Sequence, residues 1–449
     1  MYKIGLFTIA SKNYLSYVRL LMNSVQSKLP EYKRYLCLAD EIDGYFNPSD
    51  ENFEVVLSNQ LGIDSFDDMT YRYDIMELNT AVKPFMIEWL FKNTDLDIVI
   101  YLDPDIQVYS NFTILENEFE SGATVLLTPH LTDPVEDDFI PNDYHMLQAG
   151  VFNLGFIGLR RSDEVFRFVQ WWGRKLKLYC ASDVKNNLFT DQKWCDLAPC
   201  FIDNLKIIKN PGYNIAYWNM HQRKIFQEKN GNWIVSEKPL VFFHFSGINP
   251  EKVELVSKHQ NRLSWSDIVS SQPLILNYVK SLINFGWSQS KNWPYAYSQI
   301  SPSFNLNSLI NKFFREREPK QTKIDRKDIY QYIINLCNSK AEDINHLSDY
   351  IISNLMLFIY RTRTDLQKIY NLNSLEGQIE FVNWFEYNAN LDHNLTNEVV
   401  KQVNIQKNNP SLLQNKKREA LDDHITRKSS LIKRILRKLL NFYKIKDLL

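Results

Sequence analysis

The apolar run Ile98–Leu102, followed directly by Asp103-Pro104-Asp105, is the segment that most constrains the fold of this chain. An uninterrupted run of mostly β-branched or aromatic residues predicts a strand that is buried on both faces, as in a parallel sheet. Pro104 stiffens the turn that follows, and two carboxylates emerge where the strand ends. Because open α/β sheets bind ligands at the carboxyl ends of their strands, we expect a site here.

The two carboxylates of Asp103 and Asp105 suit a hard divalent cation. Mg²⁺ and Mn²⁺ prefer oxygen ligands and share them with phosphate groups. The alternative is a simple turn at a strand end, because Asp-Pro-Asp is also ordinary turn chemistry. The motif by itself leaves both interpretations open.

Short apolar runs alternate with helical patterns over the first half of the chain. The strand candidates are residues 4–10, 35–39, 54–57, 98–102, 124–128, 152–158 and 240–245. The helix candidates are residues 14–28, 69–92 and 162–177, and Ser162 is expected to cap the last of them. This alternation predicts an α/β fold with a mostly parallel sheet flanked by helices.

Composition divides the chain into four parts. We expect an α/β domain over 1–287, a polar, proline-containing linker over 288–325, a smaller helical domain over 326–415 and a basic amphipathic tail over 416–449. In the helical part, Tyr330, Ile333, Ile334 and Cys337 share one predicted helix face. The tail suits an anionic membrane surface, although a helix that packs on the protein has the same pattern.

Charge and cysteine content exclude several classes of protein. The formal net charge of −1 gives no global field for nucleic acid. The five cysteines fit neither a zinc spacing nor a disulfide framework, which is typical of reduced, mostly buried thiols. With no apolar run long enough to span a bilayer and no secretory signal, we expect a cytoplasmic protein, with a peripheral contact of the tail at the inner face of the cell membrane as an option.

Three further segments carry polar groups that suit a metal–phosphate site, and each has a structural alternative. His244 ends an apolar run, where a buried core histidine is the alternative. Asp191 and Gln192 follow Thr190, which is also a candidate helix cap. Asn79 and Lys83 are four residues apart and share a helix face, which is alternatively a solvated one.

The order of these motifs resembles that of nucleotide-sugar-dependent glycosyltransferases with the GT-A fold, most closely glycosyltransferase family 8. The matching elements are, in chain order, Asp103 and Asp105, the segment 148–155, Asp191 and Gln192, the segment 212–214, and His244-Phe245-Ser246-Gly247. They cover about the first 250 residues. The family's usual Lys-Pro-Trp after the last element is absent, since Ile248-Asn249-Pro250 stands there, which puts one diphosphate contact in doubt.

The resemblance implies a GT-A (Rossmann-like) domain and a metal-dependent glycosyltransferase of the hexosyltransferase type. It would move a sugar from a nucleotide diphosphate donor, a UDP-sugar in this family, to a glycan or lipid-linked acceptor in bacterial surface polysaccharide synthesis, with retention of anomeric configuration. Asp103, Asp105 and His244 would hold Mn²⁺ or Mg²⁺.

The resemblance also implies roles for residues around the donor. The residues expected to bind the nucleotide or its phosphates are Thr8, Ala10, Tyr14, Asp40, Asn79, Lys83, Asp103 and Gly247. Asn153, Asp191 and Gln192 are expected at the reaction centre.

Two other classes of function fit parts of the sequence. One is a Mg²⁺-dependent phosphohydrolase with Asp103 as nucleophile and Asp105 as acid, although Gln107 stands where that class carries Thr or Val. The other is a non-catalytic scaffold that binds a nucleotide sugar or a partner without turnover. Loss of metal-dependent nucleotide affinity in Asp103→Asn would distinguish the transferase from a scaffold that binds only a partner.

Overall fold

The computed structural model describes residues 2–301, 304–347, 351–393 and 395. The chain divides into two compact units, Met1–Tyr332 and Ile333–Leu449. The predicted tail over 416–449 lies outside the described residues. Within the described part of the chain, no helix is long and apolar enough to cross a membrane.

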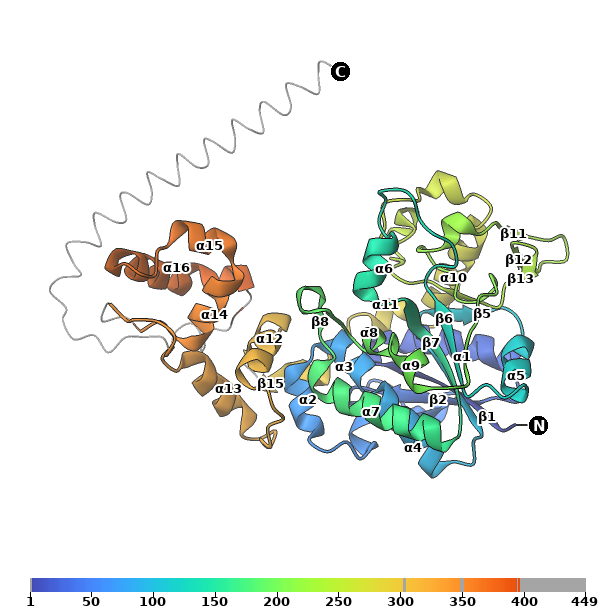
Figure 1. The fold of residues 1–449 in the computed structure, drawn as a ribbon, viewed down its shortest axis with the longest axis horizontal. Coiled ribbons are helices and arrows are strands. Elements are labelled where there is room, and N and C mark those ends of the chain that lie inside the picture. The colour runs from blue at the N-terminus through green and yellow to red at the C-terminus, as the bar shows by residue number, and fades with distance from the viewer. Residues whose placement is uncertain (1, 302–303, 348–350, 394, 396–449) are drawn as a thin grey trace, which may run out of the picture. The chain divides into compact units, whose positions relative to one another are not determined.

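The first unit is built on a seven-stranded sheet with the order β10-β6-β7-β4-β1-β2-β3 (Figure 1). Its strands are β1 (Ile4–Ala10), β2 (Lys33–Leu38), β3 (Glu54–Leu57), β4 (Ile98–Leu102), β6 (Val125–Pro129), β7 (Phe152–Arg160) and β10 (Leu205–Ile207). Strand β7 runs antiparallel to both its neighbours, and the other pairings are parallel. The expected α/β fold with a mostly parallel sheet is therefore confirmed.

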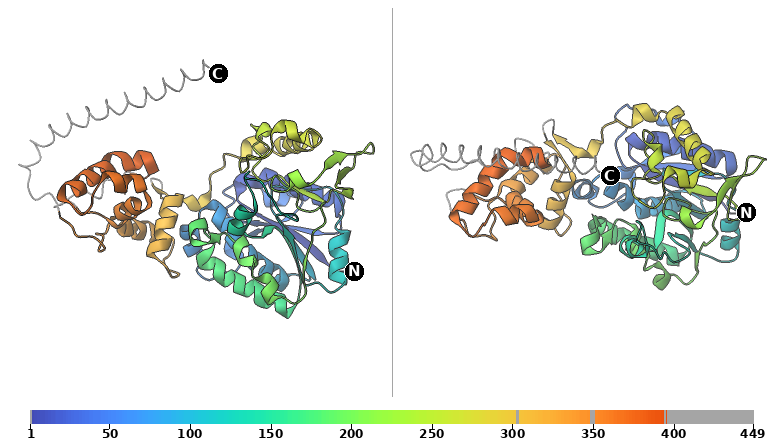
Figure 2. Two further views of the ribbon diagram at one scale, coloured as in Figure 1. Left: turned by 45° about the horizontal axis from the view of Figure 1, so that its top comes forward. Right: turned by 90° about the horizontal axis from the view of Figure 1, so that it is seen from above.

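Helices cover both faces of this sheet, as the views in Figure 2 show. The longer ones are α1 (Leu15–Lys28), α4 (Lys83–Asn93), α5 (Thr113–Glu120), α7 (Asp163–Tyr179) and α10 (Gln272–Asn284). Side chains of β1 alternate between two cores: Phe7 and Ile9 enter one, while Leu6 and Ala10 enter the other. Burial on both faces explains why the strands read as continuous apolar runs.

Local signals set the ends of the helices. Ser162 caps α7 as predicted, because its side chain accepts a hydrogen bond from the amide of Val165 at 3.2 Å. The single helix predicted over 69–92 is instead three: α2 (Phe66–Arg72), α3 (Ile75–Ala81) and α4. Asp74 begins α3 with a capping box to Glu77, which interrupts a pattern that reads as one helix.

Strands outside the main sheet complete the first unit. Strand β14 (Phe242–His244) pairs antiparallel with β5 (Ile106–Val108). The shorter strands are β8 (Ser182–Asp183), β9 (Leu188–Phe189), β11 (Ile225–Gln227), β12 (Trp233–Val235), β13 (Lys238–Pro239), β15 (Gln299–Ser301) and β16 (Phe304–Asn305). The shorter helices are α6 (Asp143–Ala149), α8 (Gln192–Cys195), α9 (Ala198–Phe201) and α11 (Trp287–Ser290).

The segment expected to be a linker, 288–325, is mostly folded onto the first unit. Its helix α12 (Ser308–Arg317) buries Ile310, Phe313 and Phe314 completely, and Asn311 donates to the carbonyl of Tyr71 at 2.6 Å. The polar, proline-containing composition hid these few apolar positions. The boundary between the compact units lies after Tyr332.

The described part of the second unit is helical. Its helices are the end of α13 (Ile329–Asn338), α14 (Asn354–Thr362), α15 (Thr364–Ile369) and α16 (Leu375–His393). Ile333, Ile334 and Cys337 are buried on one face of α13, as the apolar spacing predicted.

Candidate active site

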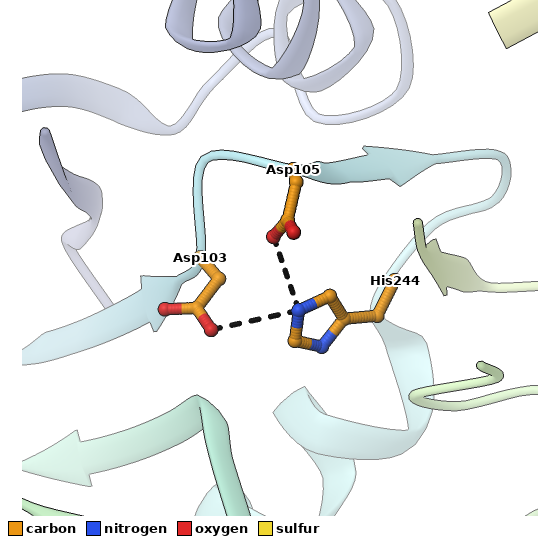
Figure 3. A group of neighbouring side chains, drawn as sticks. All are labelled: Asp103, Asp105 and His244. Carbon is orange, nitrogen blue, oxygen red and sulfur yellow. Dashed lines mark ion pairs between the residues drawn. The ribbon is translucent and has the colours of Figure 1, made fainter. Parts of the chain in front are cut away.

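Asp103, Asp105 and His244 lie together at the carboxyl edge of the main sheet (Figure 3). Asp103 follows β4, and Asp105 ends the turn into β5. His244 is the last residue of β14, which pairs with β5 so that His244 stands opposite Ile106. The amide of Phe245 also donates to the carbonyl of Asp105 at 2.9 Å. Strand register therefore brings an imidazole from late in the chain to the two carboxylates.

The geometry of these three side chains fits a divalent cation. Nε2 of His244 lies 3.0 Å from Oδ1 of Asp105 and 3.5 Å from Oδ2 of Asp103. One ligand atom from each residue lies within 4.8 Å of the others. An octahedral Mg²⁺ with bonds of about 2.1 Å separates neighbouring ligand atoms by about 3.0 Å. Two carboxylates and one imidazole are also the donor set that such ions share with phosphate.

The charges at this cluster call for a cation. Burial raises the pKa of Asp103, against the charges of Lys83 and His244. Burial lowers the pKa of His244, but the charge and hydrogen bond of Asp105 and the charge of Asp103 outweigh it and hold that pKa above its ordinary value. Positive charge between the carboxylates is therefore favourable, and either a divalent cation or the imidazole proton supplies it.

Gly155 of β7 packs directly against this cluster. A Cβ at Gly155 would lie 2.5 Å from Cε1 of His244 and 2.7 Å from Oδ1 of Asn153. The amide of Asp103 donates to the carbonyl of Gly155 at 2.9 Å. Only glycine allows the strand, the imidazole and Asn153 to approach one another this closely.

Asn153 and Gln192, both expected at the reaction centre, are neighbours in a buried amide network. The amide of Leu154 donates to Oε1 of Gln192 at 3.1 Å, and Nε2 of Gln192 donates to the carbonyl of Ala149 at 2.9 Å. Nδ2 of Asn153 donates to Oε1 of Gln192 at 3.4 Å and contacts Nε2 of His130 at 3.1 Å. Hydrogen bonds within the protein thus fix the orientation of both side-chain amides, which form a rigid surface beside the cluster.

Asp191 and Lys83 form a buried ion pair. The ammonium of Lys83 donates to Oδ2 of Asp191 and to the carbonyl of Leu154, the latter at 2.8 Å. It also lies 4.0 Å from the ring centre of Tyr101. Both side chains of the pair are almost fully buried. Lys83 was expected to face a diphosphate, and in this structure its charge is used to hold Asp191.

The residues expected around the nucleotide occupy the same edge of the sheet but differ in accessibility. Thr8 and Ala10 are buried in β1, and Oγ1 of Thr8 has no hydrogen-bond partner among the described residues. Tyr14 is 43% exposed and stacks on Tyr17 with ring centres 4.5 Å apart. Burial, together with the charge of Asp105, raises the pKa of Tyr14 to about 12. The partly exposed ring of Tyr14 is therefore within the electrostatic influence of Asp105.

Asp40, which is expected to contact a base or ribose, is held by protein groups in this structure. Both its oxygens accept hydrogen bonds from the protein, from the backbone and ammonium of Lys12 and the amides of Glu41 and Ala296. The side chain is fully buried. Asp40 therefore ties the strand edge to the segment around Ala296.

Asn79 and Gly247 are the remaining residues expected to contact the donor. Nδ2 of Asn79 donates to Oγ of Ser11 at 2.9 Å, while its Oδ1 is buried without a partner in the described part of the chain. Gly247 has φ of +72°, and a Cβ there would lie 2.4 Å from Oγ of Ser257. Gly247 is thus required by the close packing of the chain after β14.

Sequence reasoning gave no role to three residues of this site: Tyr101, His130 and Asn214. The hydroxyl of Tyr101 donates to Oδ1 of Asp103 at 2.5 Å. Burial lowers the pKa of His130 to about 4, so its ring is neutral and accepts from Asn153. His130 follows β6, so the rule that located Asp103 at a strand end would also have found it.

The alternative role of Thr190 as a helix cap is wrong. Helix α8 begins at Gln192 with Asp191 in the cap position, and no side chain caps it. Thr190 has φ of +48°, and its hydroxyl donates to Oδ1 of Asp191 at 3.2 Å. The predicted cap was one residue too early: the cap position is occupied by Asp191 and not by Thr190, and the two polar residues are equally plausible caps in the sequence.

Comparison with known proteins gives distant similarities. No family model matches the chain. It is 25% identical over 228 residues to the uncharacterized protein YfnD of Bacillus subtilis (strain 168), covering 50% of this chain and 68% of YfnD. It is 31% identical over 179 residues to the uncharacterized protein YfnF of the same organism, covering 39% of this chain and 57% of YfnF. The match thus spans less than two thirds of YfnF.

Two solved structures with similar parts are glycosyltransferases. The galactosyltransferase LgtC, solved in complex with donor and acceptor sugar analogues, is 14% identical, covers 62% of this chain and 95% of its own, and has a TM-score of 0.39. GlyE of Streptococcus pneumoniae TIGR4 is 17% identical, covers 67% and 66%, and has a TM-score of 0.35. These values do not place the chain in a family, and the case for its function rests on the site.

Proposed function

We propose that the protein is a metal-dependent glycosyltransferase that uses a nucleotide diphosphate sugar. One observation carries this proposal. Asp103, Asp105 and His244 form a cluster that fits a divalent cation, and at Gly155 this cluster packs against the buried amide network of Asn153 and Gln192. Both lie at the carboxyl edge of a mostly parallel sheet, where such folds bind ligands. The order of the sequence motifs supports the same assignment.

Asp103, Asp105 and His244 would hold Mn²⁺ or Mg²⁺. When bound, the cation supplies positive charge to a departing nucleoside diphosphate without a proton donor. Thr8 and Asn79 each have a buried polar atom without a partner among the described residues, and we assign these atoms to contacts with a nucleotide. We assign Lys83 to holding Asp191 rather than to the diphosphate, because its ammonium is already surrounded by protein groups.

The fixed amides form the wall next to the transferred sugar in this proposal. Asn153 would position the sugar, and Asp191 and Gln192 would lie near the anomeric carbon and steer the acceptor, with Asp191 held in place by Lys83. A retaining reaction needs no general base on the opposite face, and retention is the outcome that the sequence resemblance favours. The donor would be a UDP-sugar, and the acceptor a glycan or lipid-linked glycan of a bacterial surface polysaccharide.

The parts of the chain outside this site enter the proposal as accessory regions. The helices after Tyr332 would form an accessory domain, and the basic tail over 416–449 would hold the enzyme at the inner face of a membrane. Both assignments rest on the sequence pattern.

The proposal is tested by release of nucleoside diphosphate from a set of UDP-sugars in the presence of Mn²⁺. We expect release that stops when the metal is chelated and that is lost in Asp103→Asn and Asp105→Asn. Asp95→Asn is the matched control, since Asp95 is an exposed carboxylate paired with Lys3, and it should behave like the wild type. Metal-independent release, or full activity in Asp103→Asn, would contradict the proposal.

A further inference from the structure

The orientation of the His244 imidazole is set by a chain of hydrogen bonds that begins at the backbone. The amide of Gly155 donates to Oδ1 of Asn153 at 3.2 Å, which fixes that atom as the amide oxygen. Asn214 also contacts this oxygen, so it must present its nitrogen there, and its Nδ2 donates at 3.0 Å. The same Nδ2 donates to the hydroxyl of Thr128 at 2.8 Å.

With its nitrogen committed, Asn214 turns its oxygen toward the imidazole. Oδ1 of Asn214 lies 3.3 Å from Nδ1 of His244. An amide oxygen only accepts hydrogen bonds, so Nδ1 must carry a proton. The carboxylate oxygens of Asp103 and Asp105, which face Nε2, also only accept, so without a cation Nε2 carries a second proton. When a cation is bound, Nε2 can give its lone pair to the ion, because the remaining proton is held on Nδ1.

We propose that Asn214 is a positioning residue that selects the Nδ1–H tautomer of His244 and so directs the Nε2 lone pair into the carboxylate cluster. Such outer partners orient a ligating histidine and raise its basicity. Asn214 also holds Asn153, so one side chain aligns the cluster and the reaction wall. The effect on metal binding rests on the proposed function, whereas the choice of tautomer does not.

The backbone of Asn214 is suited to a variant that removes only the side chain. Its φ is +51°, a region in which glycine is unstrained. Its carbonyl accepts a hydrogen bond from Nδ2 of Asn219 at 3.1 Å, and this bond survives substitution. Asn214→Gly therefore tests the side chain with little change in the backbone. Asn187 has φ of +58° and is exposed, so Asn187→Gly is the matched control.

The experiment is a titration of each full-length variant with Mn²⁺, with free ion measured by electron paramagnetic resonance. We expect Asn214→Gly to bind Mn²⁺ about 10–100-fold more weakly than the wild type, and Asn187→Gly to match it. Asn214→Asp keeps an acceptor for Nδ1–H and should bind more tightly than Asn214→Gly. Wild-type affinity in Asn214→Gly would overturn the inference while leaving the proposed function intact.

A second readout separates the inference from the metal. Nitrogen-15 shifts of the histidine rings, assigned by comparison with His244→Gln, report at alkaline pH which nitrogen carries the proton. They are read in an Asp103→Asn/Asp105→Asn background, in which no carboxylate competes for a proton on Nε2. In this background we expect Nδ1–H at His244 when Asn214 is present and in Asn214→Asp, and a loss of this preference in Asn214→Gly. If the wild type binds no Mn²⁺, the proposed function fails, and the ring shifts still decide: an Nε2–H tautomer when Asn214 is present, or an unchanged tautomer in folded Asn214→Gly, overturns the inference.

Discussion

Substitution of Gly155 by alanine should disable the carboxylate–imidazole cluster without changing any of its three members. The new Cβ would lie 2.5 Å from Cε1 and 2.8 Å from Nδ1 of His244, and 2.7 Å from Oδ1 of Asn153. Carbon atoms in contact prefer a separation of about 3.5–4.0 Å, so the imidazole must move by roughly 1 Å. His244 cannot move this far and keep both its carboxylate contacts and its contact with Asn214.

The expected costs follow from the size of this clash. Overpacking of a buried site costs about 1–3 kcal/mol of the free energy of unfolding. Displacing the imidazole should weaken Mn²⁺ binding by about 10–100-fold, the range found when groups that orient a ligand are disturbed. Urea denaturation measures the first quantity, and Mn²⁺ titration measures the second.

Gly158→Ala is the matched control on the same strand. A Cβ at Gly158 would lie 3.0 Å from Cζ of Phe119, the far end of a core side chain. This variant should lose stability and bind Mn²⁺ normally. If Gly155→Ala binds Mn²⁺ as tightly as the wild type, the close packing of β7 against His244 does not matter for the cluster, and the reasoning is refuted.

Two further predictions concern buried ionisable groups. Lys83→Met leaves the carboxylate of Asp191 buried without its partner, so urea denaturation should show that the free energy of unfolding falls by about 3–5 kcal/mol. Adding Asp191→Asn should restore part of this loss. A loss within error of zero would contradict the role of the ion pair. Burial lowers the pKa of His130 from 6.5 to about 4, so only the unfolded chain takes up its proton as the pH falls between these values. The free energy of unfolding is therefore unaffected by the titration of His130 above pH 6.5 and falls by about 3 kcal/mol toward pH 4. Urea denaturation of His130→Gln should lack this loss. An equal acid sensitivity of the two proteins would show that His130 is not buried as a neutral ring.

Most of the main sheet was predictable because its central strands are buried on both faces, whereas the short and partly exposed strand β10 was not predicted. Three predicted strands have the observed bounds, Ile4–Ala10, Glu54–Leu57 and Ile98–Leu102. The sequence did not reveal the breaks near Asp74 and Val82, since apolar residues continue at helical spacing across them. Nor did it reveal α12, whose few buried residues are surrounded by polar ones.

The sequence was sufficient to predict candidate residues for the site, but not which of them contact one another. Strand ends pointed to Asp103 and Asp105, and the structure brings His244 beside them through the pairing of β14 with β5. The pairing of Lys83 with Asp191 joins residues on separate elements, and no local pattern signals it. Asn214 lies in a matching motif, but its contacts with His244 and Asn153 depend on long-range packing that spacing does not encode.

Thermal stability in the presence of UDP, GDP, CDP or ADP, each with and without Mn²⁺, tests the central claim most directly. A ligand that binds the folded state raises the melting temperature by mass action. The proposed site predicts a rise that requires both Mn²⁺ and a nucleoside diphosphate, largest with UDP, and that is absent in Asp103→Asn. No rise with any nucleotide and metal together, or an equal rise in Asp103→Asn, would contradict a metal-dependent nucleotide site at this cluster.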